Sequence, residues 1–418
     1  MYNADRCSCL FMDSGGGWSG TSDANGSIIR FGEPRGFFHN RDGVVTISIG
    51  GDTVSMNRDP LTVLEGLVAE GYVAVGYIGY EYSRFADSGF VPDKAKEGDR
   101  LPDINFLLFR KEDMITYPPD DSRFKFNAGV TGAGGFPGPV DDTRGALNSN
   151  MSRDEYLNMV ERAKVYIKQG DVYQVNLSQR FTVGYGLSPI ECFLRMFHVQ
   201  QVPFGCYIDF GDFQLSSGSM ELFLRRNGET LTTRPIKGTS ERGRTRESDI
   251  IKKAKLVSSE KERAENLMIV DLMRNDLSRI CKVGSVKVTR LFDVETYNTL
   301  HQLVSEVEGR LVNDIGTARI IRNTFPPGSV TGAPKRRVLE VIDELEPHYR
   351  GPYCGAVGIF LPGGDFTLSV GIRLLVTDSL KASFWVGGGI VWDSDPEKEY
   401  EETILKSLAI KKALGISE

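Results

Sequence analysis

The stretch FGCYIDFGDFQLSSGSMELFLRRNGETLTTRPI, residues 204–236, decides the fold class. It consists of short segments rich in β-branched, aromatic and other apolar residues, a composition typical of strands. The dipeptides Gly211-Asp212 and Asn227-Gly228 interrupt these segments where tight turns would fall. Two-residue turns join antiparallel neighbours, whereas parallel strands need long crossover connections. The stretch therefore predicts consecutive hairpins in an antiparallel sheet.

Strands and helices alternate on both sides of this stretch. A second strand series, GAVGIFLPGGDFTLSVGIRLLVTDSLKASFWVGGGIV, fills residues 355–391. Apolar residues at helical spacing predict helices over 152–171, 247–258, 260–279 and 395–414, and Ser152 with Glu155 forms a capping box at the start of the first. Antiparallel strands interleaved with amphipathic helices indicate an α+β fold with a layered sandwich.

Composition divides the chain into regions. Residues 1–126 are predicted to form an N-terminal α/β region of short strands and one helix, PLTVLEGLVAEG. Glycine and proline are dense in NAGVTGAGGFPGPVDDT, residues 127–143, so residues 127–151 are predicted to be a linker. Residues 152–414 then form the main domain.

The overall totals exclude several classes of protein. The chain has 418 residues, of which 40% are hydrophobic and 25% charged, as in a folded globular protein. A formal net charge of -6 provides no basic field for a nucleic-acid backbone. Six cysteines are too few for disulfide bonds to stabilise a fold of this length, and this favours a reducing, cytoplasmic setting. No stretch reaches the ~18 apolar residues that cross a bilayer, and no export signal is seen. We therefore expect neither nucleic acid nor a membrane as a partner.

Two of the predicted helices carry paired glutamates. Glu262 and Glu265 are three residues apart, so their carboxylates share one helix face. Glu399 and Glu402 repeat this spacing, and Lys406 follows one turn later. Such pairs can be an ordinary solvated charged face. If the four carboxylates instead converge on one cleft, their repulsion calls for a cation, and their oxygen atoms suit Mg²⁺.

Two glycine-rich segments could bring backbone amides to an anionic ligand. The first, GSVTGAPK at residues 328–335, precedes a predicted helix whose N-terminus would attract an anion, with Lys335 adding charge. It lacks the Gly-Lys-Ser/Thr ending of a nucleotide-binding Walker loop. The second, residues 387–389, is a glycine triplet that would let a ligand approach a strand closely, although glycines can equally mark bulges.

Five segments together resemble the chorismate-utilising enzyme family, in which they occur in the same order. They are QVNLSQRF (174–181), TRPIKGT (233–239), AENLMIVDLMRNDLSR (264–279), GSVTGAPK (328–335) and GGGIVWDSDPEKEYEETILK (387–406). The resemblance covers nearly all of residues 152–414 and extends more weakly to GYIGYEY, residues 76–82, in an N-terminal region of the anthranilate synthase component I type. It implies an antiparallel β-sandwich covered by helices, and Mg²⁺ that holds the ring carboxylate of chorismate.

The residue at position 237 separates members of this family. The strand LTTRPI is expected to end there at a glycine turn, which presents Lys237. Lysine in PIKGT resembles the aminodeoxychorismate synthases, whereas anthranilate synthases typically have alanine. The resemblance implies that Lys237 adds to C2 of chorismate while the C4 hydroxyl leaves, and that ammonia then enters at C4 and expels the lysine. This role needs a partly neutral amine. Glu221 matches the general acid that protonates the leaving hydroxyl, which needs a raised pKa.

Gln174 gives a second distinction. Isochorismate and salicylate synthases have a lysine at the matching position, where it activates water. A glutamine side chain cannot accept a proton, so ammonia rather than water is the expected nucleophile. The resemblance implies that a separate glutamine amidotransferase subunit supplies the ammonia.

The resemblance also assigns roles to other residues. It makes Glu265 and Glu402 direct Mg²⁺ ligands, with Glu262 and Glu399 close by. His301 matches a family histidine beside the ring and is a candidate catalytic residue, although a lone histidine is more often structural. The remaining matched positions are expected to bind substrate: Gln174, Thr239, Thr331, Gly332, Ala333, Tyr353, Gly355, Arg373, Lys406 and the amides of Gly388 and Gly389.

The leading prediction is an aminodeoxychorismate synthase component I of para-aminobenzoate and folate synthesis. The alternative enzyme is an anthranilate synthase component I, and a third possibility is a subunit that binds chorismate or an amino acid without turnover. The sequence departs from the family pattern at Met220, where proline is usual, at Leu374, where threonine is usual, and at GIF, residues 358–360. LFMDSGGGW, residues 10–18, corresponds loosely to the tryptophan-binding segment of anthranilate synthases, which leaves open whether Asp13 and Ser14 bind an amino acid.

Overall fold

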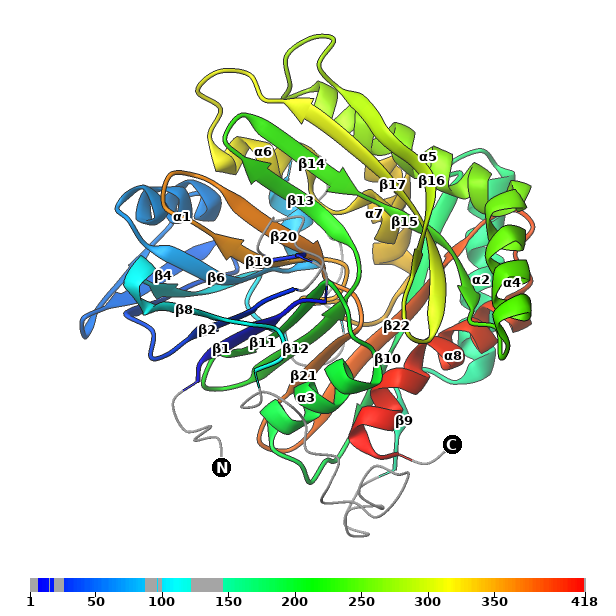
Figure 1. Cartoon of the computed structure of the whole chain (residues 1–418), viewed down its shortest axis with the longest axis horizontal. Coiled ribbons are helices and arrows are strands. Elements are labelled where there is room, and N and C mark those ends of the chain that lie inside the picture. Colours follow the sequence, from blue (N-terminus) through cyan, green and yellow to red (C-terminus); the bar gives the residue numbers. More distant parts are fainter. Residues whose placement is uncertain are drawn as a thin grey trace.

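The protein is an antiparallel β-sandwich with helices on its outer faces (Figure 1). The computed structural model describes residues 7–14, 16–18, 26–86, 96, 100–121 and 146–416. Within these ranges every strand pair is antiparallel. Both predicted hairpins are present: β11 (Phe204–Asp209) pairs with β12 (Gln214–Ser219), and β13 (Leu222–Asn227) pairs with β14 (Thr230–Arg234). The predicted fold class is confirmed.

The first sheet has ten strands within the described residues, in the order β18-β10-β22-β21-β12-β11-β1-β2-β8, with β9 beside β10. Helices α2, α3, α7 and α8 pack against it. The bounds not yet given are β1 (Cys9–Met12), β2 (Ile28–Phe31), β8 (Met114–Tyr117), β9 (Asn148–Ser149), α2 (Arg153–Lys168), β10 (Gln174–Val183), α3 (Pro189–Val199), β18 (Gly332–Ala333), α7 (Lys335–Leu345), β21 (Leu374–Thr377), β22 (Ala382–Ile390) and α8 (Pro396–Leu414).

The second sheet has twelve strands in the same described ranges, in the order β15-β17-β14-β13-β20-β19-β6-β7-β3-β4-β5, with β16 beside β17. Helices α4 and α5 pack on β15 and β17, and α1 packs on β6 and α6. The bounds are β3 (Gly36–Arg41), β4 (Val44–Ile49), β5 (Asp52–Met56), α1 (Pro60–Ala69), β6 (Val73–Ile78), η2 (Tyr80–Phe85), β7 (Ile104–Phe109), η3 (Lys111–Asp113), β15 (Ile236–Glu241), α4 (Arg246–Ser258), α5 (Glu260–Ser278), β16 (Lys287–Thr296), β17 (Leu300–Arg310), α6 (Thr317–Thr324), η6 (Gly328–Val330), β19 (Ala356–Phe360) and β20 (Phe366–Val370).

Both sheets combine strands from the two regions expected from composition. In the first sheet β1 pairs with β11, and in the second β6 pairs with β19. The boundary predicted between residues 1–126 and 152–414 therefore marks a change in composition within shared sheets. Of the predicted linker, residues 127–145 lie outside the described residues, and residues 148–149 form β9.

Helix ends follow local signals that place the paired glutamates. The predicted capping box of Ser152 and Glu155 is present at the start of α2. Ser259 ends α4 and begins α5, where its hydroxyl accepts a hydrogen bond from the backbone N–H of Glu262. Helix α8 begins after the Asp395 cap and ends at Gly415, which has a left-handed φ of 66°. These caps fix the first turns of α5 and α8, which carry Glu262 and Glu399.

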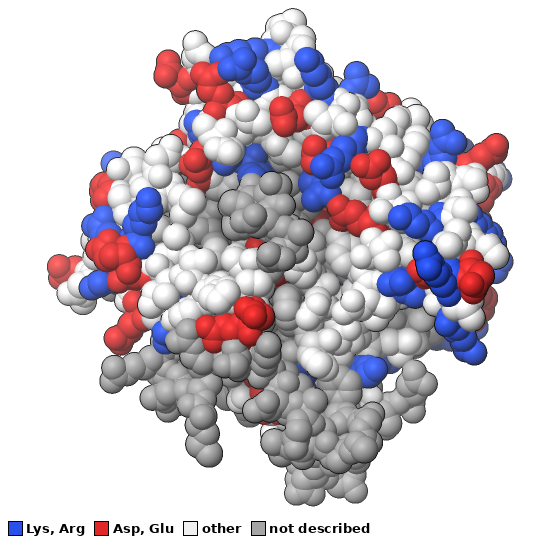
Figure 2. All heavy atoms as spheres, viewed as in Figure 1, with Lys and Arg blue, Asp and Glu red and all other residues white. Residues whose placement is uncertain are grey.

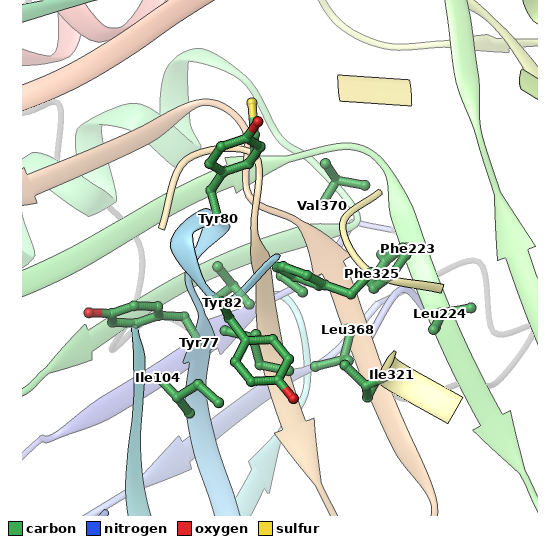
Figure 3. Packing of buried hydrophobic residues seen from close by; sticks show 14 of the residues in the cluster. Tyr77, Tyr80, Tyr82, Ile104, Phe223, Leu224, Ile321, Phe325, Leu368 and Val370 are labelled. Atoms are coloured by element: carbon green, nitrogen blue, oxygen red, sulfur yellow. The ribbon is translucent and has the colours of Figure 1, made fainter. Parts of the chain in front are cut away.

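A hydrophobic core joins the sheets and their helices. Phe325 packs edge-on against Phe223 and Tyr82, with ring centroids 6.2 Å and 5.8 Å away, and Leu368 and Ile321 lie beside them (Figure 3). The six cysteines are all buried, and none of them forms a disulfide within the described residues. Within the described residues, no helix has both the length and the apolarity needed to cross a bilayer. On the face seen in Figure 2, basic and acidic side chains are interspersed.

The segment LFMDSGGGW is held by its own side chains. The Asp13 carboxylate accepts hydrogen bonds from the backbone N–H groups of Gly16 and Trp18, at 2.7 Å and 3.1 Å. The Trp18 ring packs edge-on against Phe11 and Phe204, and its indole N–H donates to a backbone carbonyl of β11. Asp13 thus stabilises the chain's own backbone here.

Candidate active site

Lys237 lies on a β-bulge within β15 and not at the turn that the sequence suggested. Ile236 pairs with Val304, and the next paired residue, Thr239, pairs with Gln302. Lys237 and Gly238 therefore stand opposite the single residue Leu303, and Gly238 has a φ of +94°. A bulge of this kind redirects the side chain beside it, which is common next to active sites. The strand continues through the bulge, and the bulge sets the direction of the lysine.

Gly238→Ala should damage activity as well as stability. An added Cβ atom would lie 2.9 Å from Glu262 Oε2 and 3.2 Å from Leu303 Cβ, at a φ that costs about 1–2 kcal/mol for an alanine. Gly228→Ala is the matched control, because Gly228 has a φ of +57° and no heavy atom within 4 Å of the added Cβ. Both variants should lower the melting temperature, and only Gly238→Ala should lower kcat/KM, by about tenfold or more. Equal kcat/KM values in the two variants would show that the bulge does not position Lys237.

The Lys237 amine and the Gln174 amide both lie beside Gly389. A Cβ atom added to Gly389 would be 3.2 Å from Lys237 Nζ and 2.9 Å from Gln174 Nε2. Gln174 is fully buried, and neither of its side-chain polar atoms has a hydrogen-bond partner within the described structure. Burial lowers the pKa of Lys237, and Lys406 lowers it further, although Glu265 opposes the shift. The lowered pKa increases the neutral fraction of the Lys237 amine, and the Gln174 amide is available to bind a ligand.

Glu221, between β12 and β13, has the raised pKa that a general acid requires. Its side chain is 4% exposed, and one carboxylate oxygen accepts the backbone N–H of Ile236 at 3.3 Å. Burial raises the pKa of Glu221 to about 7, against the opposing effects of hydrogen bonds from Ser329 and Ile236 and of the positive charge of Lys237. The carboxyl group is thus substantially protonated at neutral pH, next to the strand that carries the lysine.

The glycine triplet lies at an open edge of the first sheet. Strand β22 pairs with β21 only from Ala382 to Phe384, so within the described residues the stretch 387–389 has a sheet neighbour on one side only, β10. The Gly387 carbonyl accepts a hydrogen bond from Lys406 Nζ at 2.9 Å. The backbone groups on this edge are therefore accessible to charged side chains of α8.

Backbone direction identifies the amides that face this edge. Gly389 is opposite Asn176, whose N–H donates to Thr331 on the far side of β10, so this is a non-hydrogen-bonded pair. The N–H of Gly389 consequently points away from β10, as does that of Gly387, while the N–H of Gly388 points toward β10. The expectation that Gly388 and Gly389 both offer amides to a ligand is wrong for Gly388, because consecutive backbone groups alternate. Gly387 and Gly389 are the available donors.

Glutamates of α5 and α8 lie near one another beside the glycine triplet, and their convergence on one cation stays a prediction. A Cβ atom added to Gly388 would lie 3.1 Å from Glu399 Oε2 and 3.6 Å from Glu402 Oε1. Burial and then repulsion from Glu265 raise the pKa of Glu262, which also experiences repulsion from Glu402 on the other helix. Burial also raises the pKa of Glu399, and Glu402 adds to this. The carboxylates are therefore close enough to repel one another.

The chemistry of this group fits a divalent cation, which would relieve the repulsion. Within the described residues, however, no three acidic, histidine or cysteine side chains already form a metal-binding cluster. Glu402 is paired with Lys406 at 2.6 Å, and Glu399 accepts a hydrogen bond from Ser394 at 2.6 Å. Burial opposes ionisation of Glu402, but the attraction to Lys406 outweighs it and lowers the pKa. The oxygen donors suit Mg²⁺, and their role as its ligands is a proposal.

His301 is buried in a network that occupies both ring nitrogens. Nε2 lies 3.0 Å from Asp249 Oδ1, and Nδ1 lies 2.9 Å from Thr296 Oγ1. The Arg242 guanidinium binds the same aspartate through two hydrogen bonds of 2.8 Å and holds the pKa of Asp249 well below its usual range. This arrangement orients the ring, and the catalytic role of His301 stays a prediction.

Tyr353 reaches the edge formed by the glycine triplet, and Arg373 contacts α8. Arg373 has a left-handed φ of +53°, and its guanidinium donates to the backbone carbonyl of Lys406. Burial lowers the pKa of Arg373. The Tyr353 hydroxyl would lie 2.8 Å from a Cβ atom added to Gly387, so it points at the triplet. The Tyr353 hydroxyl is thus placed to contact a ligand at this edge, and substrate binding by Arg373 stays a prediction.

Other predicted substrate-binding residues shape the backbone around the site. A Cβ atom added to Gly332 would lie 2.0 Å from the Gln174 carbonyl oxygen, and one added to Gly355 would lie 2.2 Å from the Ile78 carbonyl oxygen. Both positions therefore need glycine for close backbone packing. Ala333 pairs with Gln174, and the Thr331 hydroxyl donates to Pro327. Thr239 is exposed on β15.

Three further sequence features have structural roles. Lys335, expected to add charge near an anion, instead pairs with Asp276 at 2.6 Å and donates to the Thr324 carbonyl. Met220 and Leu374, which depart from the family pattern, are both buried.

Sequence reasoning missed the buried pair Glu346 and Arg350 behind the site. The two residues lie between a predicted helix and a predicted strand, where charged side chains are usually exposed. The aromatic-rich context EPHYRGPY was the only available signal.

Comparison with known proteins identifies the family. Residues 50–412 match the family model described as chorismate binding enzyme. Anthranilate synthase component 1 1 of Haloarcula marismortui is 41% identical over 276 residues, which are 66% of this chain and 56% of that protein. Aminodeoxychorismate synthase component 1 of Bacillus subtilis is 40% identical over 277 residues, 66% of this chain and 59% of that protein. The chain thus spans less than two thirds of the length of either relative.

A solved structure supports the same conclusion. Anthranilate synthase component I from Streptococcus pneumoniae aligns with a TM-score of 0.76 and 28% identity, covering 93% of this chain and 92% of that chain. Taken with the match over residues 50–412, this likeness shows that the chain belongs to the chorismate binding enzyme family.

Proposed function

We propose that this protein is an aminodeoxychorismate synthase component I, which converts chorismate and ammonia to 4-amino-4-deoxychorismate for para-aminobenzoate and folate synthesis. One observation carries this proposal: the Lys237 amine lies beside Gly389, as does the Gln174 amide, which has no hydrogen-bond partner in the described structure. Burial lowers the pKa of this amine. Relatives named anthranilate synthase and aminodeoxychorismate synthase align at 41% and 40% identity, so the choice between them rests on these site residues.

The proposed reaction uses Lys237 as nucleophile and Glu221 as acid. The neutral amine forms a bond to C2 of chorismate, the ring double bonds shift, and the C4 hydroxyl leaves as water with the proton of Glu221. Ammonia then forms a bond to C4, the double bonds shift back, and the lysine is expelled as a neutral amine. The new ammonium group returns one proton to Glu221. The balance is chorismate plus ammonia to product plus water.

Anionic groups of the substrate would be bound at the open edge of β22. The amides of Gly387 and Gly389 and the guanidinium of Arg373 are donors suited to carboxylate oxygens. Mg²⁺ held by Glu262, Glu265, Glu399 and Glu402 would neutralise the ring carboxylate when bound. A glutamine amidotransferase subunit would supply ammonia, and cysteines without disulfides in the described residues suit a cytoplasmic setting.

Product analysis tests this function. The purified chain should convert chorismate to 4-amino-4-deoxychorismate when ammonium and MgCl₂ are present, as measured by chromatography with mass detection. EDTA should stop the reaction and excess Mg²⁺ should restore it. Anthranilate as the main product would replace the proposal by anthranilate synthase. Calorimetric binding of chorismate without turnover, with metal and partner supplied, would indicate a binding subunit.

A further inference from the structure

Arg350 lies in the loop between α7 and β19, and its side chain is only 1% exposed. Its Nε and Nη2 atoms donate to both oxygens of Glu346, at 2.8 Å and 2.6 Å. Nη2 also donates to the Asn176 carbonyl at 2.6 Å, and Nη1 donates to the Val330 carbonyl at 3.3 Å. One guanidinium group therefore joins an acid to two backbone segments.

Both segments carry predicted substrate-binding residues. Asn176 is two residues after Gln174 on β10 and stands opposite Gly389 on β22. Val330 ends η6 and immediately precedes Thr331. The Arg350 guanidinium thus ties β10, two residues after Gln174, to the residue 328–333 segment.

A third segment is held through ring contacts. The Arg350 guanidinium carbon lies 4.6 Å from the Tyr80 ring centroid and 5.9 Å from that of Tyr353. The Tyr353 ring lies parallel to Trp385 of β22, with centroids 6.4 Å apart and an angle of 10°. Because the Tyr353 hydroxyl points at Gly387, movement of Arg350 would also move this hydroxyl relative to the glycine triplet.

Glu346 and Glu81 keep Arg350 in place. Glu346 Oε1 accepts the backbone N–H and the hydroxyl of Ser178, at 2.7 Å and 2.9 Å. Burial opposes ionisation of Glu346, but the attraction to Arg350 outweighs it and lowers the pKa. The Glu81 carboxylate accepts the backbone N–H groups of Arg350 and Gly351, at 2.8 Å and 2.9 Å. The N-terminal region therefore contributes to the position of this loop.

We propose that Arg350 is a positioning residue for the reaction, which sets β10, the residue 328–333 segment and Tyr353 in the arrangement that binds chorismate. This inference rests on the proposed function. A planar guanidinium can bond an acid and two carbonyls at once, whereas a lysine ammonium offers a single point charge. A buried pair that only stabilises the fold would instead affect unfolding and leave substrate affinity unchanged.

Arg350→Lys and Glu346→Gln test the proposal against Arg195→Lys. Arg195 of α3 is a matched control, because it is 2% exposed and pairs with Glu191 four residues before it. We expect Arg350→Lys to raise the KM for chorismate about 10–100-fold while kcat falls less, with a smaller rise of the same kind for Glu346→Gln. Arg195→Lys should lower the melting temperature without this change in KM.

The readouts separate this proposal from the proposed function. The product of the wild-type chain decides the function, and KM is measured on whichever amino product forms. If none forms, calorimetric Kd values for chorismate replace KM. Values for Arg350→Lys within threefold of those for Arg195→Lys would overturn the positioning role. Should Arg350→Lys not fold, Glu346→Gln, which keeps the shape of the acid, decides the same question by the same threshold.

Discussion

Lys237→Ala should lower the rate of 4-amino-4-deoxychorismate formation by on the order of 10³-fold or more. The substitution removes the nucleophile and leaves Glu221, the glutamates and the glycine triplet in place. Alanine is tolerated by the strand, because Lys237 is the first residue of a bulge whose unusual backbone is carried by Gly238. The loss should therefore appear in kcat while the melting temperature changes little. Rates with saturating ammonium, followed by chromatography of the products, measure it.

Two comparisons make this result specific. Lys237→Arg keeps a positive charge without a usable neutral amine, so it should be as inactive as Lys237→Ala. Lys252→Ala removes a lysine of α4 that pairs with Glu241, at the end of the strand that carries Lys237. This control should keep wild-type rates. Retention of full activity in Lys237→Ala would exclude the covalent route.

The residual product of Lys237→Ala carries further information. Without the lysine, C2 is open to ammonia itself, and we expect the remaining turnover to shift toward anthranilate. In the wild type incubated with chorismate and MgCl₂ but without ammonia, the reaction should stop at the lysine adduct. Denaturing mass spectrometry of the quenched chain should then detect chorismate carbon attached to a peptide that contains residue 237. A peptide without any adduct under these conditions would contradict the addition step.

Local signals in the sequence predicted the elements well. The Gly211-Asp212 and Asn227-Gly228 dipeptides identify real hairpins, and Ser152 with Glu155 forms a real capping box, because turn and cap residues act on neighbours within four positions. The spacing of Glu262 and Glu265 likewise predicts a shared helix face. Residues that act locally can be recognised without the fold.

Features that depend on distant partners could not be predicted. Gly388 was expected to offer its amide to a ligand, but the direction of that amide depends on which residue of β10 lies opposite. The bulge at Lys237 is visible only in the register with β17, and the role of Arg350 depends on three separate segments. The composition boundary after residue 126 does not reveal that both sheets continue across it. Each of these properties is set by long-range pairing.

Glu221→Gln should lower kcat by roughly 10²–10⁴-fold and change the form of the pH profile. Glutamine can donate a hydrogen bond to the leaving hydroxyl but cannot give it a proton. The acid contributes a factor that falls as the pH rises above about 7, because burial raises the pKa of Glu221 to that value. Neutral Lys237 contributes a factor that rises with pH toward its lowered pKa. When the pKa of the amine stays above 7, the wild-type kcat/KM is a bell whose acid-side limb lies near pH 7.

Without the acid, the rate no longer depends on the protonated fraction of residue 221. The residual kcat/KM of Glu221→Gln should therefore rise with pH until Lys237 is neutral, and it should show no fall at alkaline pH from these two groups. Glu81 provides a stringent control, because burial also raises the pKa of this carboxyl to about 7, yet its oxygens bond the backbone of residues 350 and 351. Glu81→Gln should therefore keep both limbs of the bell, whatever its effect on the rate. If the bell-shaped pH profile is lost in Glu81→Gln and kept in Glu221→Gln, the ionisation near pH 7 belongs to Glu81. Glu221 would then not be the acid. The two carboxyl groups have the same raised pKa of about 7, and only Glu221 lies against the strand of the nucleophile. A difference between the two pH profiles would therefore come from the position of the acid and not from its pKa.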